Sequence, residues 1–189
     1  MNLFRHADPR FPFFWESRDQ PPARWNARGE GPVQYLTDTP DGAWAEFLRH
    51  EGITDADDLL GVERDLWAVE LVPEDEPSAA PPLPPAVLEG GTETYPACQA
   101  EARRLRALGL SGFIAPSAAL LPGAASGWRV VGGAVQPGYR RDGEVIVLFG
   151  LQPHVFGWCA CFRGRPDPRI LPKVRHLPWY KVDQPGDGE

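Results

Sequence analysis

Proline and glycine restrict the possible folds of this chain more than any other feature, because 22 of its 189 residues are proline and 20 are glycine. Proline removes a backbone hydrogen-bond donor and fixes φ, whereas glycine carries a high entropic cost of ordering, so both are unfavourable inside helices and central strands. The sequence therefore predicts few helices, irregular connections and long loops.

Two segments nevertheless carry clear helix signals. In residues 39–52, Thr39 suits the N-cap, Pro40 the first turn and Gly52 the position after the end. Residues 95–109 are rich in alanine, leucine and long straight-chain side chains and end at Gly109. The first helix is expected to bury one apolar face and to carry Glu46 on its flank; that face consists of Ala43, Trp44, Phe47 and Leu48.

Several short segments rich in β-branched and aromatic residues predict strands. With two helices among several strands, and 42% hydrophobic residues in 189, we expect a single α+β domain. The expected strands are residues 31–37, 65–72, 127–133, 143–150 and 154–162, together with a strand that runs into a turn within 111–123.

Residues 73–91 contain too many prolines for a helix or a central strand. They are expected to form a loop or strap over the surface. A linker between two domains is the weaker interpretation, because the segments on either side are each too small to bury a core alone.

The chain is acidic, with a formal net charge of −7 and a pI near 5.1. Binding to nucleic acid or to an anionic membrane would need an excess of Lys and Arg, so neither is expected. A small anionic ligand stays possible, because one local arginine can hold a phosphate group. No segment approaches 18 apolar residues and the first residues lack a secretory signal, so we expect a cytoplasmic protein.

The cysteines and histidines do not form a metal-binding pattern. The three cysteines are an odd number, and Cys159 and Cys161, which lie in an alternating apolar run, are predicted to be buried thiols. The four histidines are scattered without the spacing of a zinc site. We therefore expect no metal.

Three residues between positions 24 and 46 have the chemistry of one binding pocket. Arg24 offers a planar fork for phosphate oxygens, Tyr35 offers a flat ring and a hydroxyl group, and Glu46 offers a carboxylate. Each also has an ordinary structural interpretation: a surface arginine stacked on Trp25, a core tyrosine and a solvated acid.

Ser117 follows Pro116 just after an apolar run, where a hydroxyl group can bind a ligand or a turn. No G-x-S-x-G motif and no suitably placed histidine accompany it, so a serine-hydrolase triad is not expected. The common nucleotide-binding motifs G-x-x-x-x-G-K-[ST] and G-x-G-x-x-G are absent as well.

Taken together, "FRHADPRFP", "RWNARGEGPVQYL", "AWAEFLRHEG", "YPACQAEARRLRALGLSGFIAPSAAL" and "VIVLFG" stand in the order expected of the RES domain family, which the chain resembles over roughly residues 3–150. "ARWN" and "APSA" carry the arginine and the serine that give the family its name, with Glu46 between them. Ala23 departs from the glycine that the family often has before this arginine.

The resemblance implies a fold similar to ADP-ribosyltransferase toxins, in which a split β-sheet clasps NAD. It also implies a toxin of the RES–Xre toxin–antitoxin type that cleaves the bond between nicotinamide and ribose, with water or inorganic phosphate as acceptor (a glycohydrolase or a phosphorylase). An Xre-type antitoxin and a homodimer are implied partners. Residue by residue, Arg24 would hold the phosphates, Tyr35 would pack on the nicotinamide end, Glu46 would serve the ribose and Ser117 would complete the pocket, with Trp25 and Asn26 as further binding candidates.

By this resemblance the RES domain spans residues 1–162, including the strap at about 73–91 and an insertion at about 122–142. Residues 163–189 form a basic C-terminal extension with a disordered tail. Two other functions remain open: transfer of ADP-ribose to a protein, and a catalytically silent module that binds a protein or RNA through exposed aromatic residues and the basic residues between Arg163 and Arg175.

Overall fold

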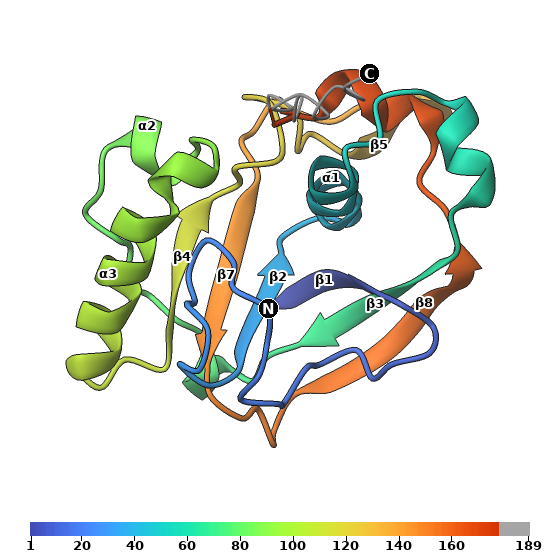
Figure 1. Ribbon diagram of the computed structural model, residues 1–189. Coiled ribbons are helices and arrows are strands. Elements are labelled where there is room, and N and C mark those ends of the chain that lie inside the picture. Colours follow the sequence, from blue (N-terminus) through green and yellow to red (C-terminus); the bar gives the residue numbers. More distant parts are fainter. Residues whose placement is uncertain (178–189) are drawn as a thin grey trace, which may run out of the picture.

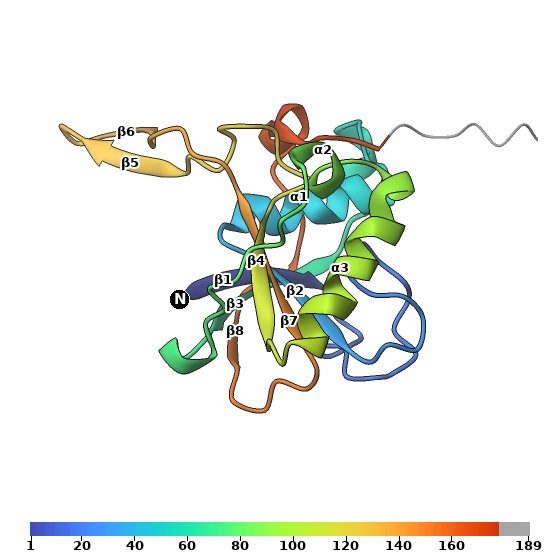
Figure 2. The same cartoon turned by 90° about the vertical axis from the view of Figure 1, so that its left-hand side faces the viewer.

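The computed structural model describes residues 1–177 of the chain, so the tail predicted to be disordered, residues 183–189, lies outside the described residues. A six-stranded antiparallel sheet has the strand order β4-β7-β2-β1-β3-β8 (Figure 1), and a separate hairpin pairs β5 with β6 (Figure 2). The strands of the large sheet are β1 (Asn2–Ala7), β2 (Val33–Thr37), β3 (Arg64–Glu70), β4 (Gly112–Pro116), β7 (Glu144–Phe149) and β8 (Phe156–Gly164).

The sheet is split at its centre. β1 and β2 are paired in register only at Phe4 and Thr37, whereas β2 pairs with β7, and β1 with β3, along most of their lengths. The strands β4, β7 and β2 therefore form one half, and β1, β3 and β8 form the other. This confirms the predicted α+β fold with a split sheet and few helices.

Helix α1 (Pro40–Glu51) begins and ends where the sequence predicts. The Thr39 side chain accepts a 3.0 Å hydrogen bond from the backbone N–H of Gly42, and Gly52 closes the helix in the left-handed conformation with φ 67°. The apolar face of α1 packs with the 3₁₀ helix η4 (Pro168–Lys173), whose Ile170 is buried, so part of the segment expected as an extension lies on the core. α1 thus lies over the region where the two half-sheets meet (Figure 1).

Helix α3 (Tyr95–Ala107) covers the β4–β7 half of the sheet through a cluster that includes Cys98, Leu105 and Phe113. The opposite face of the sheet is filled by a second cluster that includes Leu3, Leu36 and Ile146. Alternation along each strand therefore gives each face of the sheet its own apolar layer.

The segment before α3 is the strap predicted from its prolines, with one addition. Residues 85–88 form a single-turn helix, α2 (Pro85–Leu88), where the sequence predicted no helix. Pro84 and Pro85 stand at the start of this turn. Backbone N–H groups at that position have no acceptor within the helix, so their absence in proline costs no hydrogen bond. Leu88 is buried against the α3 cluster and fixes the strap to the body.

The prediction that Cys159 and Cys161 are buried is wrong, because both are exposed on β8. β8 is an edge strand whose residues are mostly exposed among residues 1–177, and Phe156, Trp158 and Phe162 are exposed as well. An alternating apolar pattern predicts burial only where another element covers the face. Cys98 is the buried thiol.

The strand predicted within 127–133 does not join the sheet. It forms β5 (Trp128–Val131), which pairs with β6 (Ala134–Pro137), a strand that was not predicted. This hairpin projects away from the body (Figure 2). β1 was not predicted either, because Arg5 and His6 interrupt its apolar pattern. No helix among residues 1–177 is both long and apolar enough to cross a membrane.

Candidate active site

A cavity of about 190 Å³ lies where the sheet divides. Its walls come from β1, β2 and the loop before it, α1, the first residue of α3, the end of β4 with the turn after it, and β7, so both halves of the split sheet contribute to it. The lining residues are Phe4, Arg5, His6, Ala23, Arg24, Trp25, Tyr35, Thr37, Ala43, Glu46, Arg49, His50, Tyr95, Pro116, Ala118 and Val145.

α1 contributes a carboxylate, a guanidinium and an imidazole to this cavity. Glu46, Arg49 and His50 are spaced three and four residues apart, which places them on one side of the helix. The Glu46 Oε2 atom lies 3.7 Å from His50 Nε2, and within residues 1–177 no hydrogen bond occupies the Glu46 carboxylate. Glu46 is therefore a half-buried anion that is open to a ligand.

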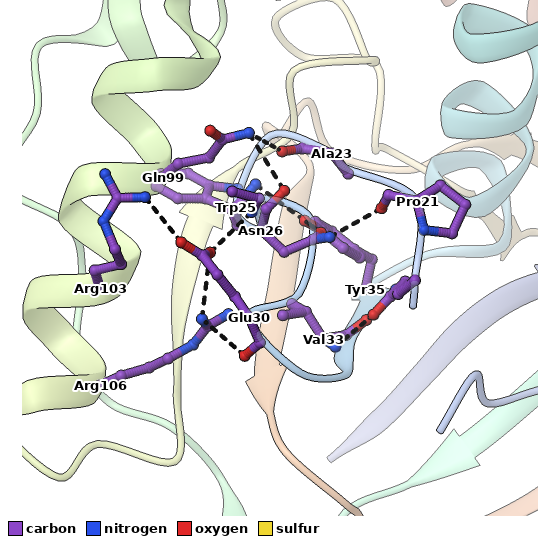
Figure 3. Close-up of polar contacts among 12 residues, drawn as sticks. Pro21, Ala23, Trp25, Asn26, Glu30, Val33, Tyr35, Gln99, Arg103 and Arg106 are labelled. Atoms are coloured by element: carbon purple, nitrogen blue, oxygen red, sulfur yellow. Dashed lines mark hydrogen bonds and ion pairs between the residues drawn. The ribbon is translucent and has the colours of Figure 1, made fainter. Parts of the chain in front are cut away.

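Tyr35 presents its ring to the cavity, while its hydroxyl group is used by the protein. The hydroxyl donates to Asn26 Oδ1 at 2.7 Å and accepts from the backbone N–H of Trp25 at 3.0 Å (Figure 3). Burial raises the pKa of this phenol far above its ordinary value, although the Trp25 hydrogen bond acts in the opposite direction. Tyr35 thus stays protonated and holds the loop that carries Arg24.

The rest of that loop is also fixed by specific contacts. Asn26 is fully buried and donates to the carbonyl oxygen of Pro21 at 2.9 Å, and Gln99 of α3 donates to the carbonyl oxygen of Ala23 at 2.9 Å (Figure 3). The Trp25 ring packs edge-on against Phe113 with 4.7 Å between centroids. Arg24 is therefore presented from a rigid loop.

The guanidinium of Arg24 is directed at the strap. It donates to the carbonyl oxygens of Val87 at 3.2 Å and Gly90 at 2.6 Å, and to Thr94 Oγ1 at 3.0 Å. Its Cζ atom lies 5.0 Å from the centre of the Tyr95 ring. Arg24 is 8% exposed, and it forms no ion pair within the described residues.

Arg49 reaches the same carbonyl group from α1. It donates to the Gly90 oxygen at 2.7 Å, and to the carbonyl oxygens of Ala118 and Arg175 at 2.6 Å each. Burial lowers the pKa of Arg49, and Arg24 lowers it further, whereas Glu46 raises it. Two buried guanidiniums therefore share one neutral acceptor, which leaves this side of the cavity cationic.

β1 adds Arg5 and His6 to the wall. Arg5 donates to Gln34 Oε1 at 3.1 Å, and burial lowers its pKa to about 10. Burial lowers the pKa of His6 to about 3, and the nearby cations Arg5 and Arg64 contribute in the same direction. The imidazole packs edge-on against Phe47 and is neutral at physiological pH.

The structure brings four of the predicted site residues together, since Arg24, Trp25, Tyr35 and Glu46 all line the cavity. Asn26 lies behind the wall as the partner of Tyr35. Ser117 lines a second hollow of about 470 Å³, and its Oγ accepts from the backbone N–H groups of Ala119 and Leu120 at 3.2 and 3.1 Å.

Sequence reasoning missed seven polar or aromatic residues of the cavity: Phe4, Arg5, His6, Thr37, Arg49, His50 and Tyr95. Helical spacing from Glu46 was a usable signal for Arg49 and His50. Arg5, His6 and Tyr95 carried no such signal, because β1 and α3 are distant in sequence from the other lining residues. Within residues 1–177 no group of three or more metal-binding side chains gathers.

A carboxylate at one side of this cavity and two guanidiniums at the other suit a ligand with a cationic or electron-poor end and an anionic end. The model of the RES domain family matches residues 2–131. A chain of the crystal structure of the M. tuberculosis MbcT–MbcA toxin–antitoxin complex has 16% sequence identity and a TM-score of 0.57, with 90% of this chain and 86% of that chain covered. At this identity the likeness concerns the fold. No curated protein matches the chain.

Proposed function

This chain belongs to the RES domain family, and from that membership and the geometry of the cavity we propose that it cleaves the bond between nicotinamide and ribose in NAD. One observation carries the proposal: the side chains of Arg24, Tyr35 and Glu46, from a loop, a strand and a helix, line the same cavity. Three unrelated surface residues would not converge in this way.

The chemistry of the bond matches these residues. As nicotinamide leaves, positive charge develops on the ribose, as in the oxocarbenium-like transition state of glycoside hydrolysis. The Glu46 carboxylate stabilises this charge more strongly than it stabilises the ground state, which is the condition for catalysis. Arg24 holds the pyrophosphate and so anchors the half of NAD that does not react.

Tyr35 acts in this proposal through its ring and through the loop that it holds. Its hydroxyl group is engaged with Trp25 and Asn26, and its raised pKa makes it unsuitable as a base. Ser117 acts indirectly, because its hydroxyl group fixes the turn whose neighbours Pro116 and Ala118 line the cavity.

We further propose that water or inorganic phosphate accepts the ADP-ribosyl group, and that the protein acts in the cytoplasm as a toxin controlled by an Xre-type antitoxin. The likeness to a chain of the MbcT–MbcA structure, a toxin–antitoxin complex, supports an antitoxin partner. An association of two copies of this chain is also proposed.

The alternative of a basic binding module has less support from the structure. Arg169, Lys173 and Arg175 form ion pairs with Asp167, Asp41 and Glu89 at 2.6, 3.0 and 2.8 Å. Three charges of the basic segment are thus balanced by the protein's own carboxylates.

The test is to incubate the purified protein with NAD, with and without inorganic phosphate, and to identify the products by chromatography and mass spectrometry. Free nicotinamide with ADP-ribose indicates a glycohydrolase, and nicotinamide with a phosphorylated ADP-ribose indicates a phosphorylase. ADP-ribose linked to a protein would identify the alternative, a protein ADP-ribosyltransferase. If no nicotinamide is released under any of these conditions, the proposed function is wrong.

A further inference from the structure

The carbonyl oxygen of Gly90 occupies the point where two buried cations meet. Arg24 Nη2 and Arg49 Nη2 donate to it at 2.6 and 2.7 Å. Neither arginine has an ion-pair partner within residues 1–177, and a neutral carbonyl group offsets little of their mutual repulsion. A doubly charged anion in the same place would satisfy both guanidiniums.

We propose that the Gly90 carbonyl oxygen occupies the position that the diphosphate of the substrate takes when it binds. The peptide between Gly90 and Gly91 then flips and moves this oxygen away. Arg49 then acts beside Arg24 as the second phosphate-holding residue. This inference rests on the proposed function for the identity of the substrate, but the binding of a diphosphate tests it independently.

The size of the cavity supports a displacement. At about 190 Å³ it is smaller than the roughly 300–1,000 Å³ of typical ligand sites, and NAD is a large ligand. The second hollow, of about 470 Å³, meets the first at Pro116 and is bordered by Glu89, the residue before Gly90. Gly90 follows Glu89 in the chain, and the two arginines that donate to its carbonyl oxygen line the first cavity, so we infer that a dinucleotide spanning both hollows would bring its diphosphate to this turn.

The local backbone allows the flip without movement of the rest of the strap. Leu88 stays anchored in the core before the turn, and after it the Gly91 carbonyl oxygen accepts hydrogen bonds from Thr94 N and Thr94 Oγ1 at 3.1 and 2.8 Å. Among residues 1–177, the Gly91 N–H donates only to the exposed side chain of Glu93, at 2.8 Å. Rotation of this one peptide turns the Gly90 oxygen away from the arginines and directs the Gly91 N–H toward the bound phosphate.

Glycine at position 91 is what makes this rotation accessible. Gly91 now has φ −83° and ψ −164°, a conformation that any residue adopts. A flip of the preceding peptide would change φ to about +97° at the same ψ, a region that only glycine occupies readily. An alanine at this position would therefore be compatible with the present conformation and would oppose the flipped one.

Gly91→Ala is accordingly the decisive variant. The three atoms nearest to a Cβ atom there all belong to the end of the exposed Glu93 side chain, with Oε2 at 2.3 Å, and this flexible group can move aside. Gly61→Ala is the matched control, because Gly61 has no atom within 4 Å of the added Cβ and lies outside the cavity. Equal melting temperatures for the two variants would show that the substitution leaves the fold intact.

The first measurement is the affinity for ADP by calorimetry, since ADP carries the diphosphate but no bond that the enzyme cleaves. We expect the unmodified protein and Gly61→Ala to bind ADP with the same Kd, and Gly91→Ala to bind it about tenfold or more weakly. If Gly91→Ala binds ADP as tightly as the control, the flip does not occur. If the unmodified protein binds neither ADP nor inorganic pyrophosphate, the two arginines are not a diphosphate site.

The second measurement compares nicotinamide release from NAD and from nicotinamide riboside, which has the same scissile bond and no phosphate. Arg49→Gln is expected to raise the KM for NAD about tenfold to a hundredfold, as for a lost charge-assisted hydrogen bond, and to lower kcat/KM for the riboside much less. Equal losses for both substrates would contradict a phosphate-holding role. If the protein binds ADP but releases no nicotinamide, the proposed function is wrong, whereas the diphosphate site is supported.

Discussion

The hydroxyl group of Tyr35 donates a 2.7 Å hydrogen bond to the side-chain oxygen of Asn26, nine residues earlier in the chain (Figure 3). Because the same hydroxyl accepts from the backbone N–H of Trp25 at 3.0 Å, a residue of the central sheet fixes the loop on both sides of the Trp25–Asn26 peptide. Arg24, the residue before Trp25, thereby keeps its place in the cavity wall. Tyr35 is a positioning residue as well as a lining residue.

Tyr35→Phe tests this relationship. The change leaves the Trp25 N–H and the Asn26 oxygen without their partner, which costs about 1–3 kcal/mol of unfolding free energy for buried groups. For a domain of this size we expect the melting temperature to fall by about 2–10 °C. We also expect the KM for NAD to rise more than kcat falls, because the carboxylate is untouched. An unchanged melting temperature and KM would show that the hydroxyl does not hold the loop.

Glu46→Gln removes the proposed stabiliser of the ribose cation while keeping the shape of the side chain. We expect nicotinamide release from NAD to fall about 10²- to 10³-fold, the usual effect of losing one electrostatic contact to a transition state. ADP binding should persist, because Arg24 and Arg49 are unchanged. Glu51→Gln is the matched control, since Glu51 lies on the same helix outside the cavity. Equal rates for the two variants would remove Glu46 from the mechanism.

The buried His6 makes stability depend on pH. Its pKa is lowered by burial from 6.5 to about 3, so below pH 6.5 the unfolded chain takes up a proton that the folded chain does not. Stability is therefore full above pH 6.5 and falls as the pH drops toward 3, by up to about 1.4 kcal/mol per pH unit.

Denaturant unfolding of the unmodified protein and His6→Gln between pH 7 and 5 measures this effect. Carboxylates with lowered pKa values, such as that of Asp8 beside Arg10, contribute mainly at lower pH. We expect the difference between the two unfolding free energies to shrink as the pH falls through this window. A constant difference would mean that His6 titrates in the folded protein as it does in the unfolded chain.

The β5–β6 hairpin should be dispensable for folding. All of its strand residues are exposed, and its ends meet where the Gly138 N–H donates to the Gly127 carbonyl oxygen at 2.9 Å. Replacing residues 128–137 with a two-glycine linker is expected to change the melting temperature by only a few degrees and to leave nicotinamide release unchanged. A large loss of stability would show that the hairpin supports the body of the domain.

The local pattern of the sequence was sufficient for the ends of α1. Thr39, Pro40 and Gly52 act within a few residues of the helix that they delimit, so their effect can be predicted from neighbouring positions alone. The β-branched and aromatic residues of β2 and β7 likewise predicted strands that the sheet contains. Alternation failed for β8, because it does not indicate whether another layer covers the strand.

The candidate site was predicted through family resemblance, because the structural explanation was the better one for Arg24, Tyr35 and Glu46 taken one by one. Arg49 and His50 could have been predicted from their helical spacing to Glu46. His6 was not, since its strand breaks the apolar pattern by which strands are recognised.

By itself the sequence determined the class of the fold, the two long helices, the Pro-rich strap and the kinds of side chain that a dinucleotide would need. Only the tertiary structure decided what those side chains contact. Arg24 bonds to Val87, Gly90 and Thr94, which are 63 to 70 positions away along the chain. The physical reason is that caps and turns depend on bonds between near neighbours, whereas a partner across the fold is chosen by the packing of the whole domain.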